Sequence, residues 1–304
     1  MLLNRFVLSE PTMTKPHSPL RYPGGKSCLL PLVSSVIRAN RLQRCHYVEP
    51  YAGGGGLALS LLFGGYVSDI HINDLDPSIW SFWKAVLDHT DDFVRLVETV
   101  PIDLKQWHIQ KEIQSTGDKS DPLTLGFAAF FLNRTNRSGI IKGAGVIGGL
   151  AQTGDYKIDC RFNREELARR IRRIKKYRSR IHLTRKDAVK FMRQSSNLPP
   201  ETLFCIDPPY FKKGSKLYTS FYGPNDHKVV SEAVLSLQFP WLVTYDNAKE
   251  IRHLYSSRRQ FVFDINYSVQ TKRVGTELLV VSKGLRLPAE VREHKLTNAS
   301  SAAI

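Results

Sequence analysis

The chain is poor in the residues and patterns that mark secreted, membrane-spanning or metal-dependent proteins. Its 304 residues include four cysteines, at positions 28, 45, 160 and 205, whose spacing suggests neither a disulfide framework nor a zinc site. We therefore expect a reducing, cytoplasmic compartment and no metal, which argues against a zinc-dependent base deaminase. The sequence has no apolar run long enough to cross a bilayer and no apolar core before a small-residue cleavage site, so neither a membrane span nor a signal peptide is expected.

Acidic residues are scarce relative to basic ones. The chain has 44 Lys plus Arg against 28 Asp plus Glu, a formal net charge of +16 at pH 7. An excess of this kind favours a polyanionic partner. With 42% hydrophobic residues the chain can bury a substantial core, so we expect one large domain with an insertion, or two domains.

The excess positive charge is concentrated between residues 161 and 190, which hold thirteen basic and three acidic residues. Apolar residues recur at helical spacing from Leu167 to Ile174, so an apolar stripe can pack on the body of the protein while basic side chains face outward. We expect Arg170 and Arg173 on this helix to contact DNA phosphates, which would position the protein without reading sequence. A solvated basic helix face is the alternative.

An acid, two prolines and an aromatic residue follow a short apolar run. The run Leu203–Ile206 predicts a buried strand, and Asp207, Pro208, Pro209 and Tyr210 come directly after it. The two prolines hold the turn extended and aim their carbonyls outward. Asp207 and the Pro208 carbonyl can accept hydrogen bonds from a nucleobase amine, and Tyr210 offers a ring for a base swung out of the stack. A proline-rich turn that ends a strand is the alternative.

A second strand runs into a glycine turn. Tyr47–Glu49 precede the glycines at 53 to 56, and the alternating stretch Val67–Ile72 ends near Asp74. An acid at the end of the next strand is placed to bind ribose hydroxyls in a doubly wound nucleotide fold. Glu49 would repel a pyrophosphate but pair with a cationic amino group, so a sulfonium nucleoside that carries an amino acid fits better than NAD.

Five motifs occur in a fixed order along the chain: Leu20–Lys26, Val48–Gly55, Ile72–Asp74, Phe131–Arg134 and Asp207–Tyr210. Together they resemble the Dam-type DNA adenine-N6 methyltransferases, and the resemblance covers roughly residues 18 to 285. It implies transfer of the methyl group of S-adenosyl-L-methionine to adenine N6 in double-stranded DNA by base flipping, without a covalent enzyme intermediate. Transfer to cytosine N4, transfer to RNA adenine, and a catalytically silent DNA-binding regulator remain as alternatives.

The resemblance also implies roles for individual residues. It assigns catalysis to Asp207, Pro208, Pro209 and Tyr210. It places the cofactor against Tyr22, Lys26, Glu49, Pro50, Tyr51, Ala52, Gly53, Gly55, Asp74 and Asp207. For Asp187 two interpretations stay open, contact with the adenine of the cofactor or capping of the helix that follows.

The stretch after the Asn-Arg motif is rich in glycine and poor in core residues. In Dam-type enzymes this region contacts the recognition site, so we expect a hairpin loop that inserts into a DNA groove. The candidates to touch bases or backbone are Arg134, Arg137, Lys142, Gln152 and Lys157. Because the loop differs from that of the best-known members, the resemblance does not predict a GATC target, and a mobile connector is the alternative.

These observations predict an α/β fold, a Rossmann-like methyltransferase sheet with an antiparallel edge hairpin and an inserted, mostly helical DNA-recognition domain. The expected divisions are a flexible extension over 1–17, a catalytic domain over 18–90 and 185–285, an insertion over 91–184 and a flexible tail over 286–304. We expect the basic and aromatic stretch Tyr218–Tyr222, with lysines at 212, 213 and 216 nearby, to close over the flipped base or the DNA strand, with a surface loop as the alternative. A monomer is expected, and a dimer is left open.

Overall fold

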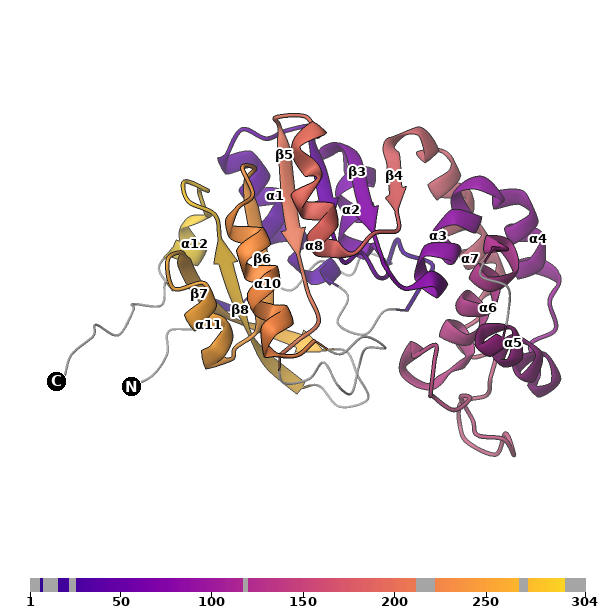
Figure 1. Ribbon diagram of the computed structural model, residues 1–304. Helices are drawn as coiled ribbons and strands as arrows, with labels where there is room; N and C mark the ends of the chain where they lie inside the picture. Colours follow the sequence, from indigo (N-terminus) through magenta and orange to yellow (C-terminus); the bar gives the residue numbers. More distant parts are fainter. Residues whose placement is uncertain are drawn as a thin grey trace.

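The computed structural model describes residues 6–7, 16–21, 26–116, 120–211, 222–267 and 273–292. Its centre is an eight-stranded sheet in the order β1-β7-β8-β6-β5-β2-β3-β4 (Figure 1). Every neighbouring pair is parallel except those that involve β8, which runs antiparallel to both β6 and β7. The strands are β1 Phe6–Val7, β2 Cys45–Glu49, β3 Val67–Asn73, β4 Ile181–Thr184, β5 Thr202–Ile206, β6 Trp241–Asp246, β7 Arg259–Tyr267 and β8 Arg273–Val281.

The order of the strands reverses between β2 and β5. From β2 the chain continues outward to β3 and β4, whereas β5 and β6 extend the sheet in the other direction. In doubly wound sheets a ligand binds outside the carboxyl ends of the strands at such a reversal. The predicted glycine turn follows β2 and the predicted catalytic turn follows β5, so both lie at this point.

The sheet is apolar on both faces, which is why its central strands lack simple alternation. Tyr47 and Leu203 belong to the core on one face, whereas Val48 and Phe204, their neighbours along the chain, belong to the core on the other. Figure 1 shows α1 (Leu30–Ala39) and α2 (Gly56–Phe63) behind the sheet, and the remaining covering helices in front. These are α8 Ala188–Arg193, α10 Pro224–Leu235 and α11 Lys249–Leu254.

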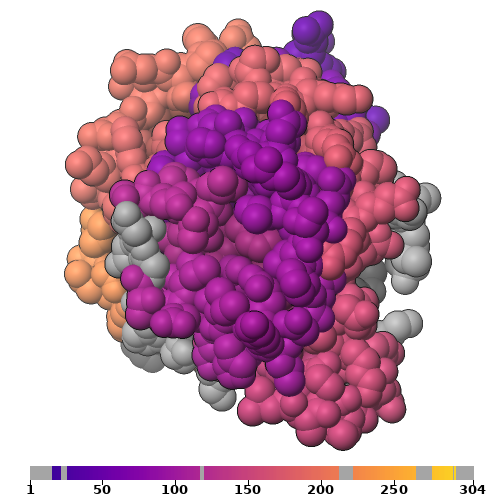
Figure 2. All heavy atoms as spheres, turned by 90° about the vertical axis from the view of Figure 1, so that its right-hand side faces the viewer, coloured from indigo at the N-terminus to yellow at the C-terminus, as the bar shows by residue number. Residues whose placement is uncertain are grey.

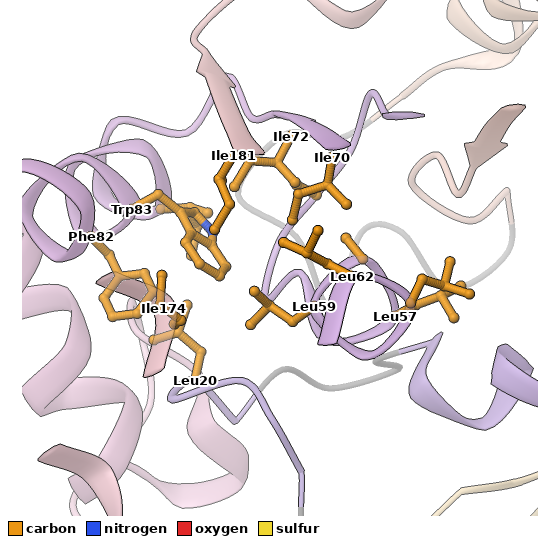
Figure 3. Close-up of a cluster of buried hydrophobic side chains, with 14 of the residues drawn as sticks. Leu20, Leu57, Leu59, Leu62, Ile70, Ile72, Phe82, Trp83, Ile174 and Ile181 are labelled. Carbon is orange, nitrogen blue, oxygen red and sulfur yellow. The ribbon is translucent and has the colours of Figure 1, made fainter. Parts of the chain in front are cut away.

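A helical lobe lies beside β4 (Figure 1). Its helices are α3 Pro77–Asp88, α4 Thr90–Thr99, α5 Leu104–Thr116, α6 Pro122–Thr135 and α7 Arg164–Lys175. The lobe has an aromatic core in which Phe82 stacks on Phe130 with ring centroids 6.0 Å apart. Figure 3 shows that this core continues from Ile174 and Trp83 to Ile70 and Leu59 under the sheet, so the lobe is not a separately packed unit.

The predicted fold is confirmed, and some boundaries differ. The predicted insertion ended at residue 184, but β4 within it pairs with β3 and belongs to the sheet. The lobe also begins earlier than predicted, with α3 at Pro77. Within the predicted N-terminal extension, Phe6 and Val7 form β1 and pair with β7. No helix among the described residues is long and apolar enough to cross a membrane.

Candidate active site

The glycine turn after β2 is fixed by the indole of Trp83. Gly53 and Gly55 have positive φ angles of 49° and 56°, where residues with a Cβ atom are disfavoured. The Trp83 Nε1–H donates to the Gly53 carbonyl at 2.9 Å. A Cβ atom on Gly55 would lie 2.7 Å from Cζ2 of the same indole. The turn therefore requires glycine, and it leads directly into the N-terminus of α2.

Asp74 is held against this turn from the end of β3. Its Oδ2 accepts from the Gly53 N–H at 2.9 Å, and its Oδ1 accepts from the Asp76 N–H at 3.0 Å. Burial raises the pKa of Asp74 to about 6, although both N–H donors favour the ionised carboxylate. The structure thus brings the predicted ribose-binding acid to the predicted glycine turn.

Asn73 joins the carboxyl ends of three strands, a role that the sequence analysis did not assign. Its side-chain amide donates to the Pro50 carbonyl at 3.0 Å and to the Lys186 carbonyl at 2.9 Å. Its Oδ1 accepts from Thr184 Oγ1 at 2.7 Å and from the Lys186 N–H at 3.0 Å. All four hydrogen bonds are made by a side chain that is fully buried.

Glu49, the last residue of β2, carries a buried carboxyl group. Its Oε1 accepts a hydrogen bond from the Tyr47 hydroxyl at 3.0 Å. Desolvation raises the pKa of Glu49 to about 8, because the tyrosine bond only partly offsets the cost of burying the charge. A cationic group at this point would favour the ionised form.

Asp207 follows β5 and is bound from two sides. The Thr244 hydroxyl donates to its Oδ1 at 2.7 Å, and the ammonium of Lys26 lies 3.2 Å from the same oxygen. Burial raises the pKa of Asp207 to about 6. The charge of Lys26 opposes this shift, whereas that of Glu277 reinforces it. The group can therefore titrate close to neutral pH.

Lys26, Tyr210 and Glu277 form one hydrogen-bonded network beside Asp207. The Lys26 ammonium donates to both oxygens of Glu277, at 3.2 and 3.1 Å, and to the Tyr210 hydroxyl. The Tyr210 hydroxyl in turn donates to Glu277. The Glu277 side chain is only 1% exposed and comes from β8, opposite Asp246 in register. No motif in the sequence assigned a role to Glu277.

Two further cofactor candidates have defined contacts in the structure. The Tyr51 hydroxyl lies 3.4 Å from that of Tyr222, which joins the glycine turn to the segment after the catalytic turn. Asp187 accepts a hydrogen bond from the Lys190 N–H at 2.9 Å and caps α8, as the capping interpretation expects. Tyr22 and most of the basic and aromatic stretch before Tyr222 lie outside the described residues.

Two residues predicted to contact DNA form hydrogen bonds within the protein itself. Arg134 is 7% exposed and donates to the Pro19 carbonyl, so it lies inside the protein rather than open to a groove. The Gln152 side chain forms three hydrogen bonds within its own loop and holds that loop together. Their polar side chains are used for folding, and the sequence alone could not distinguish this use from DNA contact.

The other DNA candidates lie at or near the surface. Arg137, Lys142 and Lys157 are exposed on the segment that joins α6 to α7. Arg170 is partly buried and binds Glu166 and the Ser18 carbonyl. The guanidinium carbon of Arg173 lies 4.2 Å from the centroid of the Phe63 ring on α2. In Figure 2 the helical lobe faces the viewer, and pink atoms of the segment between α6 and α7 project at its lower edge.

Comparison with known proteins defines the class to which this site belongs. Residues 22–273 match the family of D12 class N6 adenine-specific DNA methyltransferases. This match spans most of the sequence, so the chain belongs to that family, and the predicted resemblance is confirmed. No curated protein sequence matches the chain.

Several solved structures are similar, all distantly. TrmN from Thermus thermophilus has 10% identity and a TM-score of 0.39, with 84% of this chain and 48% of that chain covered. A putative RNA methyltransferase from Pyrococcus horikoshii has 10% identity and a TM-score of 0.38, with 91% of each chain covered. The rRNA methyltransferase aviRa from Streptomyces viridochromogenes has 14% identity and a TM-score of 0.36, with 86% and 85% covered. The chain spans about half the length of the TrmN chain, and similarities this distant carry no argument about substrate.

Proposed function

We propose that the protein transfers the methyl group of S-adenosyl-L-methionine to the N6 amine of adenine in double-stranded DNA. The observation that carries this proposal is the meeting of the glycine turn and the Asp207–Tyr210 turn at the strand reversal of the sheet. A nucleoside cofactor at one turn and a base at the other would be adjacent there.

The residues around the glycine turn fit such a cofactor. Gly53 and Gly55 allow a ligand to approach the backbone at the start of α2, and Asp74 offers carboxylate oxygens for ribose hydroxyls. Glu49 is a buried carboxyl group whose pKa of about 8 would fall beside the amino group of a methionine moiety. When bound, S-adenosyl-L-methionine would supply an electrophilic methyl group on a sulfonium.

The surroundings of Tyr222 support a place for the cofactor's adenine beside Asp187. Burial raises the pKa of Tyr222, and the negative charges of Asp187 and Asp74 act on it in the same direction. These side chains therefore share one region above the carboxyl ends of the strands. We propose that Asp187 caps α8 and also lies beside the adenine of the cofactor.

The catalytic turn supplies what an unreactive aromatic amine needs. The Asp207 carboxylate and the Pro208 carbonyl would accept hydrogen bonds from the N6 amine and so favour a localised lone pair on nitrogen. Lys26 and Thr244 hold Asp207 in its ionised form. Glu277 and Lys26 fix the hydroxyl of Tyr210, whose ring would stack on the flipped base and offset part of the cost of unstacking.

The test is a transfer assay with defined acceptors. Purified protein is incubated with methyl-labelled S-adenosyl-L-methionine and unmodified duplex DNA, single-stranded DNA or RNA, and the products are digested to nucleosides. We expect label in N6-methyldeoxyadenosine from duplex DNA. Label in N4-methyldeoxycytidine or in RNA would contradict the proposed acceptor, and DNA binding without transfer would favour a silent regulator.

A further inference from the structure

Four arginines gather around the short segment that precedes Tyr22. The Arg134 guanidinium donates to the Pro19 carbonyl, and Arg170 Nη1 donates to the Ser18 carbonyl at 3.0 Å. Charge interactions also connect Arg134 with Arg21 and with the exposed Arg161. The group therefore combines residues of α6 and α7 with one residue before α7 and one from the N-terminal segment.

The segment that carries Arg21 is held firmly in place. Asn133 accepts from the Arg21 N–H at 2.7 Å and donates to the Arg21 carbonyl at 2.7 Å. A Cβ atom on Gly139 would lie 3.1 Å from the Arg21 Cβ, so the arginine packs against the turn after α6. Figure 3 shows Leu20, one residue earlier, beside Ile174 in the buried core.

The positive charges of this group are poorly balanced. The carboxylate of Glu166 accepts a hydrogen bond from Arg170 at 2.9 Å. The same carboxylate also binds the exposed Arg169, so its charge is shared between two arginines. Burial and the charges of Arg170, Arg21 and Arg161 together lower the pKa of Arg134 to about 9. Like charges in a partly desolvated place are unfavourable unless an anion lies between them.

Two buried nitrogen atoms of the group also lack acceptors. Within the described part of the chain, Arg21 Nη1 and Arg134 Nε are buried and have no hydrogen-bond partner. A buried N–H group without an acceptor is unfavourable, so such groups are normally paired. The oxygens of a phosphate group are acceptors of the kind that guanidinium groups bind best.

We propose that Arg21 and Arg161, with Arg134 and Arg170 behind them, form a site for one phosphate group of the DNA backbone. This inference rests on the proposed function, because it assumes that DNA is the substrate. Arg21 lies five residues before Lys26, so their Cα atoms are at most about 18 Å apart. The proposed phosphate site is therefore connected by a short stretch of chain to Lys26 in the active-site network.

Salt-dependent DNA binding tests the site. Arg21→Gln and Arg161→Gln are compared with wild-type protein and with Arg172→Gln, a control on α7 whose guanidinium binds the exposed Glu98. Loss of one phosphate contact should reduce the slope of log K against log salt by about 0.9. We expect this change in both test variants on every DNA sequence, with affinity lowered several-fold, and no change in the control.

Inorganic phosphate distinguishes a DNA site from a site for a free anion. Without DNA, phosphate should raise the thermal unfolding temperature of wild-type protein and of Arg172→Gln, but not that of Arg21→Gln or Arg161→Gln. Equal stabilisation of all four proteins, or of none, would overturn the site. Loss of phosphate binding in the test variants with an unchanged DNA salt slope would assign the site to a free anion and overturn the DNA assignment.

The binding measurements do not depend on methyl transfer. A changed salt slope in protein that methylates no DNA would leave the phosphate site standing and refute the proposed function. Normal methyl transfer to DNA with unchanged salt slopes in the test variants would support the proposed function and refute the phosphate site.

Discussion

Replacing Glu277 with glutamine should shift the pH dependence of methyl transfer toward acid. The carboxylates of Glu277 and Asp207 bind the same Lys26 ammonium at 3.1 and 3.2 Å. Their oxygens are thus about 6 Å apart or less, a separation at which two charges repel by about 3 kcal/mol at an effective dielectric constant of ~20. This repulsion corresponds to about two pKa units if nothing opposes it.

The expected shift is smaller because Lys26 lies between the two carboxylates and offsets part of their repulsion. In wild-type protein the pKa of Asp207 is about 6, and the charge of Glu277 contributes to raising it. Removing that charge should lower the acidic limb of the kcat profile from about pH 6 by about one unit. At neutral pH, kcat should still fall about tenfold or more, because the Tyr210 hydroxyl loses a charged acceptor worth ~1.5–3 kcal/mol.

Thr244→Val is the matched comparison. The Thr244 hydroxyl donates to Asp207 at 2.7 Å and holds its pKa down, so its loss should move the acidic limb upward. The assay is the rate of transfer at saturating cofactor and DNA between pH 5 and pH 9. An acidic limb that stays in place or rises in Glu277→Gln, or that falls in Thr244→Val, would refute the electrostatic role given to this network.

Three further changes have defined outcomes. Gly55→Ala should destabilise the fold by about 1–3 kcal/mol and weaken cofactor binding, because its Cβ would meet Trp83. Gly65→Ala is the control, since Gly65 also has a positive φ but open space around it, and its cofactor affinity should be unchanged. Calorimetry measures the stability and the cofactor affinity of each variant. Asn73→Ala should cost about 2–4 kcal/mol in urea unfolding through its four lost hydrogen bonds, and a loss well under 1 kcal/mol would contradict its clamping role. The folded-state pKa of Glu49, about 8, lies above its ordinary value, so cofactor-free protein should lose stability as the pH rises from about 5 to 8. Glu49→Gln should abolish this pH-dependent loss of stability and weaken cofactor binding. A variant whose stability varies with pH as in the wild-type protein would refute the role given to Glu49.

Much of the sheet could be predicted because its strands carry a clear pattern. The stretch Tyr47–Glu49, the alternating stretch Val67–Ile72 and the apolar run Leu203–Ile206 predicted strands that the structure contains as β2, β3 and β5. β4 was missed because its four residues lie beside a strongly basic segment and are too short to show a period. Its place in the sheet comes from its pairing with β3, which sequence periodicity does not report.

The candidate site was predictable where motifs lie close together in sequence, and not where partners are far apart. Glu277 is a lone acid in the middle of β8, and nothing near it in the sequence indicates that it binds Lys26, 251 residues earlier. Arg134 and Gln152 have the chemistry of DNA contacts, but their partners are backbone groups of the protein. Only burial and geometry separate the two uses.

The central claim is best tested by the pattern of modified bases that the protein produces in a cell. A bacterial host without its own methyltransferases would express either the wild-type chain or Asp207→Ala, and modified bases would be mapped across the genome by single-molecule sequencing. The account predicts N6-methyladenine at one short sequence motif with wild-type protein and none with the variant. Modification at cytosine N4, or N6-methyladenine that persists in Asp207→Ala, would contradict it.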